Sequence, residues 1–389
     1  MNDIQDASLL ETVARAARLR EGPPGVAAVI RSVYRRGSSR LREVAQDVHL
    51  PLPVATAVRR ELEKAGLLER KQGLSLTPSG RRFAELNLGL RTDVDVVCET
   101  CHGRGIVVPP ALTELTDHLT SIVANAPAVD VTLDQAPCTP ETSIMRALLM
   151  LETGALEGRR VLVLGDDDSV SIAIGLIGKS LRGTDLPRRL AVVDADARRL
   201  SFISDVARDE RFAVDVVHHD LREPLPEHLR GNFDVVETDP PYTLAGARLF
   251  LARGAEALMP AVSGQVFFSF AEWSGEQLLA LEQLSLELGF AIRRIRSGFN
   301  RYVGATVLGN VGQLFELVQV LPPSKEMLTW DAPLYTAQFR SGPRVYVCAS
   351  CNAEIMLGED GTPSTIEALK AAGCPECTGR IFRRRAGRT

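Results

Sequence analysis

The chain has 389 residues, which is long for one domain and indicates two or three. Its composition, 45% hydrophobic and 24% charged, is that of an ordinary globular protein, and a net charge of −4 supports neither a nucleic-acid coat nor an acidic tail. An acidic N-terminus and the lack of a long apolar run argue against a signal peptide and a membrane span, so we expect a cytoplasmic protein. Seven cysteines, most of them in Cys-x-x-Cys pairs, indicate metal binding rather than disulfides.

Residues 1–92 have the order of elements of a winged helix-turn-helix, a family that this segment resembles. Helical patterns precede a break at residues 49–53, a longer helical pattern ends at Ala65-Gly66, and two short extended segments flank Gly73. The cations of the longer helix and the wing could meet a phosphate backbone or form a solvated face. They are Arg59, Arg60, Lys64, Arg70 and Lys71. Because the chain is acidic and an enzyme domain follows, we do not favour nucleic acid as a partner.

Residues 93–140 are interpreted as a knuckle and linker. Cys98 and Cys101, with His102 beside them, could supply half of a tetrahedral zinc site. Two ligands do not complete such a site, so this pair either borrows partners or stays free of metal. The polar run through Pro140 indicates a linker or an insertion that faces the substrate. Cys138 stands alone, and we expect a small core or surface residue rather than a nucleophile.

Residues 141–340 alternate strand and helix patterns, which predicts an α/β domain. The expected strands are residues 160–164, 190–194, 213–217, 233–237, 265–270, 291–297 and 313–320. Helical patterns separate the first six, and only a loop separates the last two. This succession is typical of the seven-stranded class I methyltransferase-like (Rossmann-like) fold, in which the last strand inserts antiparallel.

The first of these strands runs into Gly165 and three aspartates, Asp166, Asp167 and Asp168. In a doubly wound fold the first strand-to-helix turn holds the ligand, and a phosphate site would expose backbone N–H groups there instead of carboxylates. The turn therefore predicts a ligand with positive charge. We assign Asp166 and Asp167 to catalysis, and Gly165 and Asp168 to substrate binding.

Further acids stand at the ends of the next strands. Asp194 is placed to accept both ribose hydroxyls, and Asp220 to accept an adenine amino group. Glu237 lies at the end of the fourth strand and is also assigned to substrate binding. Each acid alone could be a surface charge or a helix cap, but their recurrence at strand ends of one fold favours binding.

The Asp-Pro-Pro-Tyr motif follows the fourth strand. Proline lacks an N–H and keeps the preceding residue extended, so the carbonyl oxygens of Asp239 and Pro240 are free to accept hydrogen bonds. With the Asp239 carboxylate they predict a cradle for an amine, and Tyr242 offers a ring face to it. We expect Asp239 to position and deprotonate the attacking amine, with Tyr242 in the catalytic set. The alternative is a proline turn that merely ends a strand.

Together, GDDDSVSIA, VVDAD, HHDLREPLP and TDPPYTLAGARLFLARG resemble the branched-chain polyamine synthases, N4-bis(aminopropyl)spermidine synthases, over about residues 148–320. The winged helix and the Cys-x-x-Cys before the catalytic domain are similar as well. The resemblance implies transfer of aminopropyl groups from decarboxylated S-adenosylmethionine to the secondary amine of spermidine, with release of methylthioadenosine. Two transfers would give a quaternary ammonium. We expect a polyamine partner and a homodimer.

Two other functions stay open. One is an S-adenosylmethionine-dependent amino methyltransferase of nucleic acid, which shares Asp-Pro-Pro-Tyr, and the other is a transcription regulator that senses polyamine. The carboxylate of ordinary S-adenosylmethionine would lie badly against Asp166 and Asp167, whereas each charge-assisted hydrogen bond to a cationic donor is worth about 1.5–3 kcal/mol. The chain also lacks a glycine-rich donor loop and keeps the acceptor motif, so we favour the aminopropyltransferase.

Residues 341–389 carry two Cys-x-x-Cys pairs that predict a zinc ribbon, followed by a basic tail. The ligands are Cys348, Cys351, Cys374 and Cys377. Four thiolates leave no open coordination position, so we assign the zinc a structural role. The related family has a flexible, substrate-acting region here, which leaves the acceptor and the number of transfers open.

Overall fold

The computed structural model describes residues 3–48, 50–92, 98, 100–101, 103–183, 185–260, 264–273, 275–303, 311–330, 334, 344–357, 369–370 and 372–384. The chain forms two compact units, Met1–Leu334 and Tyr335–Thr389. Among the helices in the described ranges, none combines the length and the apolar character needed to cross a bilayer.

The N-terminal elements follow the order read from the sequence. Their bounds are α1 Asp3–Ala17, α2 Gly22–Arg36, α3 Leu41–Asp47, α4 Leu52–Lys64, β1 Leu68–Arg70, β2 Leu74–Leu76 and α5 Pro78–Asn87. Strands β1 and β2 form an antiparallel hairpin. Val29, Ile30 and Leu62 are fully buried in a core that these helices share with the hairpin. Amphipathic helices and a short hairpin therefore enclose a separate apolar core.

Three of the five cations assigned to the longer helix and the wing form ion pairs within this region, namely Arg59, Lys64 and Lys71. Arg59 is only 6% exposed and forms an ion pair with Glu63 at 3.0 Å. Lys64 lies 2.6 Å from Glu61. The interpretation that placed Arg59 on a surface open to a phosphate backbone is wrong, because its position on α4 faces the core and its charge is already paired.

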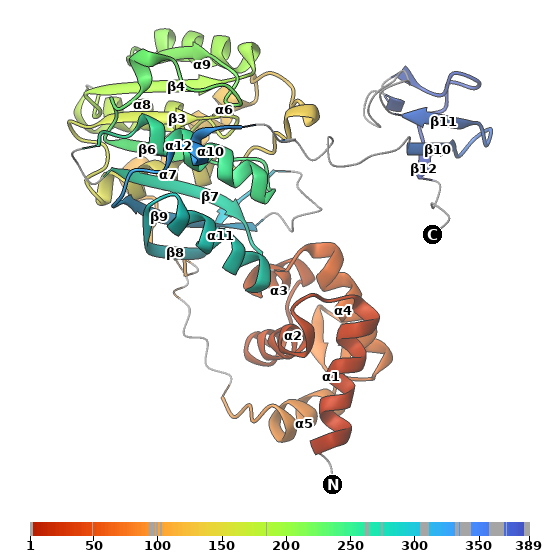
Figure 1. Cartoon of the computed structure of the whole chain (residues 1–389). Helices are drawn as coiled ribbons and strands as arrows, with labels where there is room; N and C mark the ends of the chain where they lie inside the picture. The colour runs from red at the N-terminus through yellow and green to blue at the C-terminus, as the bar shows by residue number, and fades with distance from the viewer. Residues whose placement is uncertain are drawn as a thin grey trace. The chain divides into compact units, whose positions relative to one another are not determined.

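The seven-stranded sheet predicted for the central domain is confirmed. The strands are β3 Arg160–Leu164, β4 Arg189–Asp194, β5 Asp215–His218, β6 Val235–Thr238, β7 Gln265–Ala271, β8 Phe290–Arg301 and β9 Val311–Gln319. Their order is β5-β4-β3-β6-β7-β9-β8, and β9 is antiparallel to both of its neighbours. Figure 1 shows the strands side by side with helices on both faces. Parallel strands end at one edge, where ligands of such sheets bind.

α-Helices link β3 to β4, β4 to β5, β6 to β7 and β7 to β8. The helices are α8 Val170–Arg182, α9 Ala197–Glu210, α10 Leu244–Ala257 and α11 Gly275–Glu287, with the short α12 Lys325–Leu328 after the sheet. Between β5 and β6 the chain makes only a short 3-10 helix, η3 Glu227–Leu229. The helical pattern expected there is wrong, since Pro224 and Pro226 remove backbone donors that an α-helix would need.

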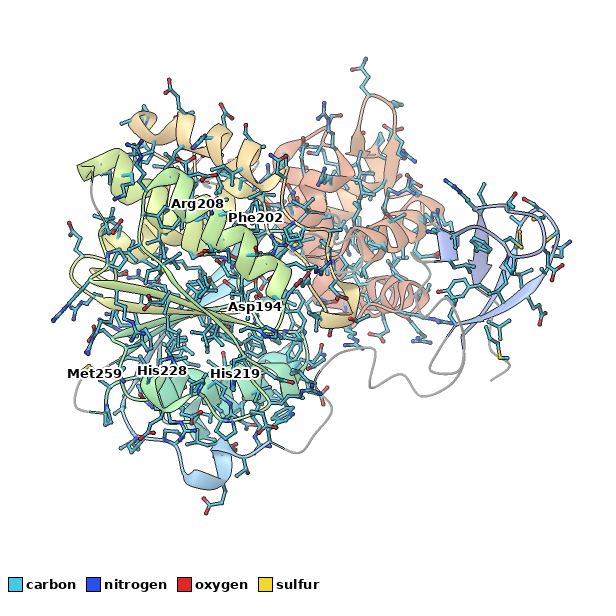
Figure 2. The ribbon with its side chains drawn as sticks, turned by 90° about the horizontal axis from the view of Figure 1, so that it is seen from above. Asp194, Phe202, Arg208, His219, His228 and Met259 are labelled. Atoms are coloured by element: carbon cyan, nitrogen blue, oxygen red, sulfur yellow. The ribbon has the colours of Figure 1, made fainter. Side chains whose placement is uncertain are left out.

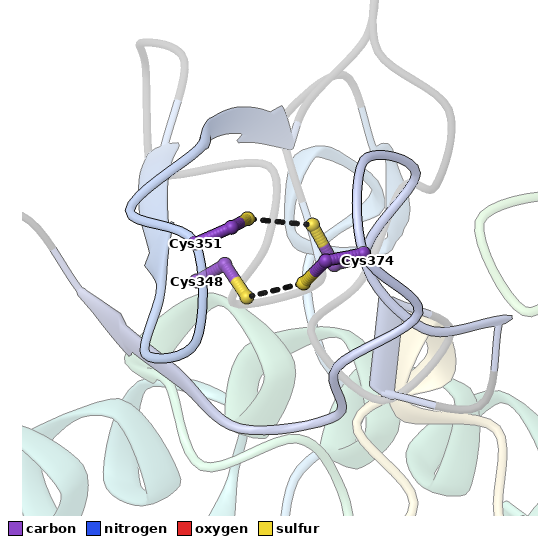
Figure 3. Close-up of side chains that lie close together, drawn as sticks. Cys348, Cys351 and Cys374 are labelled. Atoms are coloured by element: carbon purple, nitrogen blue, oxygen red, sulfur yellow. Dashed lines mark hydrogen bonds between the residues drawn. The ribbon is translucent and has the colours of Figure 1, made fainter.

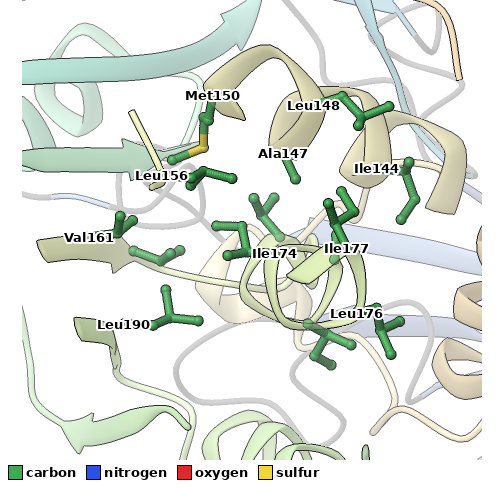
Figure 4. Close-up of a cluster of buried hydrophobic side chains, with 14 of the residues drawn as sticks. Ile144, Ala147, Leu148, Met150, Leu156, Val161, Ile174, Leu176, Ile177 and Leu190 are labelled. Carbon is green, nitrogen blue, oxygen red and sulfur yellow. The ribbon is translucent and has the colours of Figure 1, made fainter. Parts of the chain in front are cut away.

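The segment expected to be a linker belongs partly to the core. It forms η1 Pro110–Leu112, α6 Thr113–Val123 and η2 Val131–Leu133, and it leads into α7 Pro140–Glu152. Leu119 of α6 is fully buried in the cluster that contains Ile144 of α7 and Ile177 of α8. Figure 4 shows part of this cluster, with α7 and α8 side chains packed towards Val161 of β3. Helix α6 therefore has one apolar face that packs on the core. The polar residues on its other face are the reason that the sequence suggested a linker.

Side chains alternate in direction along each strand, and the helices they contact show which helices cover which face of the sheet. Val161 and Val163 belong to the cluster with α7 and α8. Val236 of β6 lies instead against Gly254 of α10, where an added Cβ would stand 3.5 Å away. Because successive residues of a strand point to opposite faces, the core of this domain is a sheet covered on both sides.

The C-terminal unit contains a small antiparallel sheet. Strands β10 Arg344–Cys348, β11 Glu354–Leu357 and β12 Phe382–Arg384 lie in the order β11-β10-β12. Its buried residues include Leu357 and Leu369, which pack beside Cys348 and Cys374. So small a core requires an additional source of stability.

Candidate active site

The turn after β3 is shaped by Gly165. Its φ is +68°, a left-handed conformation that residues with a Cβ adopt at a cost, and an added Cβ would stand 3.4 Å from Phe250. The Gly165 N–H donates to the Val193 carbonyl at 2.8 Å. This bond ties the turn to β4 and directs the three aspartates across the end of the sheet.

Asp166 lies at the N-terminus of α8 and is completely buried. Its carboxylate accepts hydrogen bonds from the Val170 N–H at 2.7 Å, from the Ser171 N–H at 3.2 Å and from the Ser171 hydroxyl. Burial raises the pKa of Asp166 to about 7, although these bonds favour the charged form. Both oxygens are thus used to cap the helix, and the helix N-terminus favours their negative charge.

Asp167 and Asp168 point to the segment that precedes α7. Asp167 accepts a hydrogen bond from the Ala136 N–H at 2.8 Å, and Asp168 accepts one from the Cys138 N–H at 2.5 Å. Burial raises the pKa of Asp167 well above its ordinary value, and the charges of Asp168 and Asp239 raise it further. The aspartates therefore form one electrostatic cluster that includes the Asp-Pro-Pro-Tyr motif.

The two carboxylate oxygens of Asp239 differ in their hydrogen bonds. Its Oδ2 accepts hydrogen bonds from Arg146 Nη2 at 2.7 Å and from the Tyr302 hydroxyl at 2.8 Å. Its Oδ1 is buried and has no hydrogen-bond partner within the described residues. Burial raises the pKa of Asp239 to about 7, Arg146 opposes this, and Asp168 adds to it. A carboxylate that titrates near neutral pH and keeps a free oxygen is suited to take a proton from an amine.

Aromatic rings surround the motif. Tyr242 packs edge-on against Phe270, at 5.4 Å between ring centroids, and against Tyr302, at 5.8 Å. Trp273 packs edge-on against Phe270 at 4.6 Å. Burial raises the pKa of Tyr242 well above its ordinary value, so the ring stays a neutral phenol. Aromatic faces beside buried carboxylates favour a cationic ligand.

The remaining assigned acids divide between the cluster and the surface. Glu237 is 1% exposed and its Oε1 lies 3.4 Å from Arg146 Nη1. Asp220 is outside this cluster, since its side chain is 39% exposed and its Oδ2 lies 2.6 Å from Arg222 Nη2. The side-chain hydrogen bonds that Arg222 donates to Asp220 lower the pKa of Asp220.

Asp194 lies at the end of β4, beside the turn that carries His219 (Figure 2). Its Oδ2 accepts a hydrogen bond from the Asp166 N–H at 3.0 Å, and its Oδ1 accepts one from the Asp196 N–H at 2.8 Å. Burial raises its pKa. Asp194 therefore links the turns that follow β3 and β4.

The sequence interpretation missed Arg146, Asn300 and Tyr302. Arg146 is 1% exposed on α7, and Asn300 and Tyr302 are also buried at the end of β8. One signal for Arg146 was present, namely a lone charge in the otherwise apolar run SIMRALLML. Asn300 and Tyr302 carried none, because the pairing that brings Tyr302 next to Cys138 is a long-range bridge.

Cys138 is buried, as expected for a small core residue. Its Sγ lies 3.2 Å from the Ser143 hydroxyl. Burial raises the pKa of the Cys138 thiol well above its ordinary value, and Asp168 raises it further. The thiol therefore stays protonated and is a poor nucleophile.

The four cysteines of the C-terminal unit come together as the sequence predicts. Their sulfur atoms lie within 4.8 Å of one another, with Cys348–Cys377 and Cys351–Cys374 distances of 3.6 Å, and Figure 3 shows the side chains converging. A tetrahedron with Zn–S bonds of about 2.3 Å has edges of about 3.8 Å, so the set fits zinc. No cluster of three or more ligands in the described residues includes Cys98 or Cys101, and His102 lies outside those residues.

Comparisons with known proteins found a matching family model and similar sequences. A family model described as the branched-chain polyamine synthase A C-terminal domain matches residues 114–330. An uncharacterized protein of Methanocaldococcus jannaschii is 35% identical over 96% of this chain and 92% of its own length. An N(4)-bis(aminopropyl)spermidine synthase of Thermococcus kodakarensis is 35% identical over 65% of this chain and 71% of its own length.

A solved structure is similar over most of the chain. It is the branched-chain polyamine synthase of Thermus thermophilus in complex with N4-aminopropylspermidine and 5'-methylthioadenosine. The two chains are 26% identical, the match covers 86% of this chain and 98% of the other, and the TM-score is 0.65. The chain therefore belongs to the branched-chain polyamine synthase family.

Proposed function

We propose that the protein transfers aminopropyl groups from decarboxylated S-adenosylmethionine to the secondary amine of spermidine and releases methylthioadenosine. The observation that carries this proposal is the buried Oδ1 of Asp239, which has no hydrogen-bond partner among the described residues and lies beside further carboxylates and aromatic rings. The names of the relatives agree with it, and so does the product bound in the Thermus thermophilus structure.

The charge of the site fits a polyamine. Asp168, Glu237 and Asp239 each form an ion pair with the buried Arg146. Asp167 lies close enough to Asp168 and Asp239 for their charges to raise its pKa. If all four acids are ionised, the group has an excess of negative charge that a bound polycation would neutralise. The same excess disfavours a donor that carries its own carboxylate, and so supports the decarboxylated one.

In the proposed reaction, Asp239 Oδ1 accepts the proton of the acceptor amine, and the nitrogen lone pair attacks the carbon attached to the sulfonium. A C–N bond forms, the C–S bond breaks, and its electron pair leaves on the sulfur of methylthioadenosine. A second transfer starts from the tertiary amine in its unprotonated form, whose lone pair attacks in the same way, and it gives a quaternary ammonium. Asp167 and Tyr242 hold the cationic groups close to the reacting carbon.

The donor would lie along the ends of β3, β4 and β5. We propose that Asp194 accepts the ribose hydroxyls and that Asp220 accepts the adenine amino group after exchanging part of its contact with Arg222. Gly165 gives the backbone room to turn, and Asp166 positions the turn through its cap on α8. Asp168, Glu237 and Pro240 complete the substrate site.

Donor choice tests this function directly. Purified protein is incubated with spermidine and either decarboxylated or ordinary S-adenosylmethionine, and in a parallel arm with DNA or RNA. We expect methylthioadenosine to form only from the decarboxylated donor with spermidine. Methylation of nucleic acid with ordinary S-adenosylmethionine would establish the methyltransferase instead, and binding of spermidine without any turnover would favour a sensor.

We also propose roles for the flanking regions. Residues 1–92 form a winged helix that packs or dimerises rather than binds nucleic acid, because Arg59, Lys64 and Lys71 are paired with glutamates. Residues 341–389 form a ribbon held by one structural zinc. The enzyme acts as a homodimer in the cytoplasm, where its thiols stay reduced. Light scattering and metal analysis test the dimer and the zinc.

A further inference from the structure

Arg146 is a fully buried arginine in the apolar helix α7. It is 1% exposed, and its helix neighbours Met145 and Ala147 are buried as well. A buried guanidinium is strongly destabilising unless its charge and its N–H groups find partners. Its retention at this place therefore requires specific contacts.

Those contacts join four separate parts of the domain. Nη1 lies 2.5 Å from Asp168 Oδ2 and 3.4 Å from Glu237 Oε1. Nη2 lies 2.7 Å from Asp239 Oδ2, and Nε donates to Asn300 Oδ1 at 2.9 Å. The planar guanidinium thus links α7 to the turn after β3, to β6 and the motif behind it, and to β8.

The contacts on Asp239 determine which of its oxygens is available. Arg146 and the Tyr302 hydroxyl both donate to Oδ2, so this oxygen is held on two sides. Oδ1 keeps no partner among the described residues. Rotation of the carboxylate would break both bonds to Oδ2, and the orientation of Oδ1 is fixed as a result.

We propose that Arg146 is the positioning residue of the active site, which gathers three carboxylates and directs Oδ1 of Asp239 to the acceptor amine. This inference rests on the proposed aminopropyl transfer. It adds to the site a residue that lies outside both the aspartate turn and the Asp-Pro-Pro-Tyr motif. Arg146 does not touch the reacting atoms in this arrangement. It acts through Asp239.

The charged and titratable groups around Asp239 set the direction of a pH effect. They are Arg146 of α7, Asp167 and Asp168 of the turn after β3, Glu237 of β6, Tyr242 of the motif, Cys138 before α7 and Tyr302 just after β8. Arg146 is the cation of this set and lowers the pKa of Asp239, whereas Asp168 raises it. Loss of the Arg146 charge therefore moves the acidic limb of the kcat/KM profile to higher pH.

Two substitutions separate geometry from charge. Arg146→Lys keeps a positive charge but cannot form the planar fork, so we expect the acidic limb to stay near that of the wild type while kcat falls about 10²-fold. Arg146→Gln removes the charge, so we expect the limb to move to higher pH in addition. Tyr302→Phe removes one donor from Asp239 Oδ2, keeps the ring, and shifts the limb in the same direction by less.

Arg253 provides a matched control. It is another fully buried arginine, on α10, and it donates to the carbonyl oxygens of Leu221 at 2.7 Å and Leu328 at 2.8 Å. Within the described part of the chain, its other partners are Glu256 and the Arg222 carbonyl, so it contacts none of the carboxylates around Asp239. Arg253→Lys should lower the melting temperature but leave kcat and the position of the acidic limb unchanged.

The experiment compares these variants by kcat, by kcat/KM against pH and by melting temperature, with decarboxylated S-adenosylmethionine and spermidine. If Arg146→Gln does not fold, Arg146→Lys and Tyr302→Phe still decide the question. Wild-type kcat in Arg146→Lys, or an unmoved limb in Tyr302→Phe, would overturn the positioning role. Absence of turnover in the wild type would instead refute the proposed function, so the two failures are distinguishable.

Discussion

At the scale of single residues, the account depends on Asp239. A carboxylate in water titrates near pH 4 and is a weak base, whereas burial raises the pKa of Asp239 to about 7. In the part of the chain that the structure describes, Oδ1 has no hydrogen-bond partner. A buried carboxylate oxygen that has lost its hydrogen bonds to water and has no donor in their place is destabilised. A substrate N–H that donates to it would relieve this.

Replacement of Asp239 by asparagine keeps the shape of the side chain and removes the base. We expect Asp239→Asn to bind the donor as the wild type does and to lower the single-turnover rate by about 10²–10⁴-fold. The rise of kcat/KM through pH 7 should disappear as well, because the wild type needs Asp239 ionised. Calorimetry and rapid quench measure the two quantities.

Asp234 is the control for this substitution. Asp234 lies just before β6 and Asp239 just after it, so the two carboxylates lie at opposite ends of the strand. Asp234 Oδ2 lies 3.2 Å from Arg160 Nε. Asp234→Asn should lower stability without changing turnover. Normal turnover in Asp239→Asn would show that another group takes the proton.

The acids of this site were predictable from the sequence, but Arg146, which binds three of them, was not. Asp166, Asp167, Asp168 and Asp239 lie in short local motifs, and local motifs can be read without a structure. Arg146 belongs to no motif, since its partners come from four elements that only the folded sheet brings together. The pattern also could not tell that Asp166 faces a helix end and that Asp220 pairs with Arg222.

At the scale of elements, the strands were predictable because buried parallel strands are continuous apolar runs. Strand β3 was predicted with both ends correct, at residues 160–164, and β7 to within one residue. The gap between β5 and β6 and the helix α6 were read incorrectly. In both places polar and proline residues mask the local pattern, and packing against the rest of the domain decides the structure.

Gly165 tests the turn between β3 and α8. Gly165→Ala forces a Cβ into a left-handed conformation, which costs roughly 1–2 kcal/mol of unfolding free energy, and moves the aspartate turn. Gly183 after α8 is also left-handed, at φ +66°, but no atom lies within 4 Å of an added Cβ. We expect similar losses of stability in urea titrations of both alanine variants, but weaker donor binding only for Gly165→Ala. Equal donor binding would contradict the proposed donor turn.

Cys374 tests the zinc ribbon. Because the unit has few buried residues, we expect the metal to supply much of its stability. Cys374→Ser should lose the zinc and the protection of amides in residues 344–384 against hydrogen exchange, while Cys98→Ser should keep both. Absence of zinc from a wild-type protein whose C-terminal unit remains protected would refute the site.

At the scale of the whole molecule, burial of several acids links stability to pH. The pKa values of Asp166 and Asp239 are about 7 in the folded protein and near 3.8 when exposed. Between these values the folded state binds more protons than the unfolded state, so the unfolding free energy falls as pH rises from about 4 to 7 and then levels off.

A bound polycation should reverse that loss of stability. We expect spermidine to raise the melting temperature more at pH 8 than at pH 6, because the carboxylates around Asp239 are ionised at the higher pH. Sodium chloride at the same ionic strength serves as the control. An equal shift at both pH values would mean that the amine binds away from this cluster.

In the proposed reaction, the site directs an aminopropyl group to the secondary amine of its acceptor. Tandem mass spectrometry of the products formed from decarboxylated S-adenosylmethionine and spermidine tests it most directly, because fragmentation locates the added group. We expect a branched product with one or two aminopropyl groups on the internal nitrogen, and far less of it in the same time with Asp239→Asn. A product extended only at a terminal amine, or no aminopropyl product at all from folded protein, would contradict the proposed reaction.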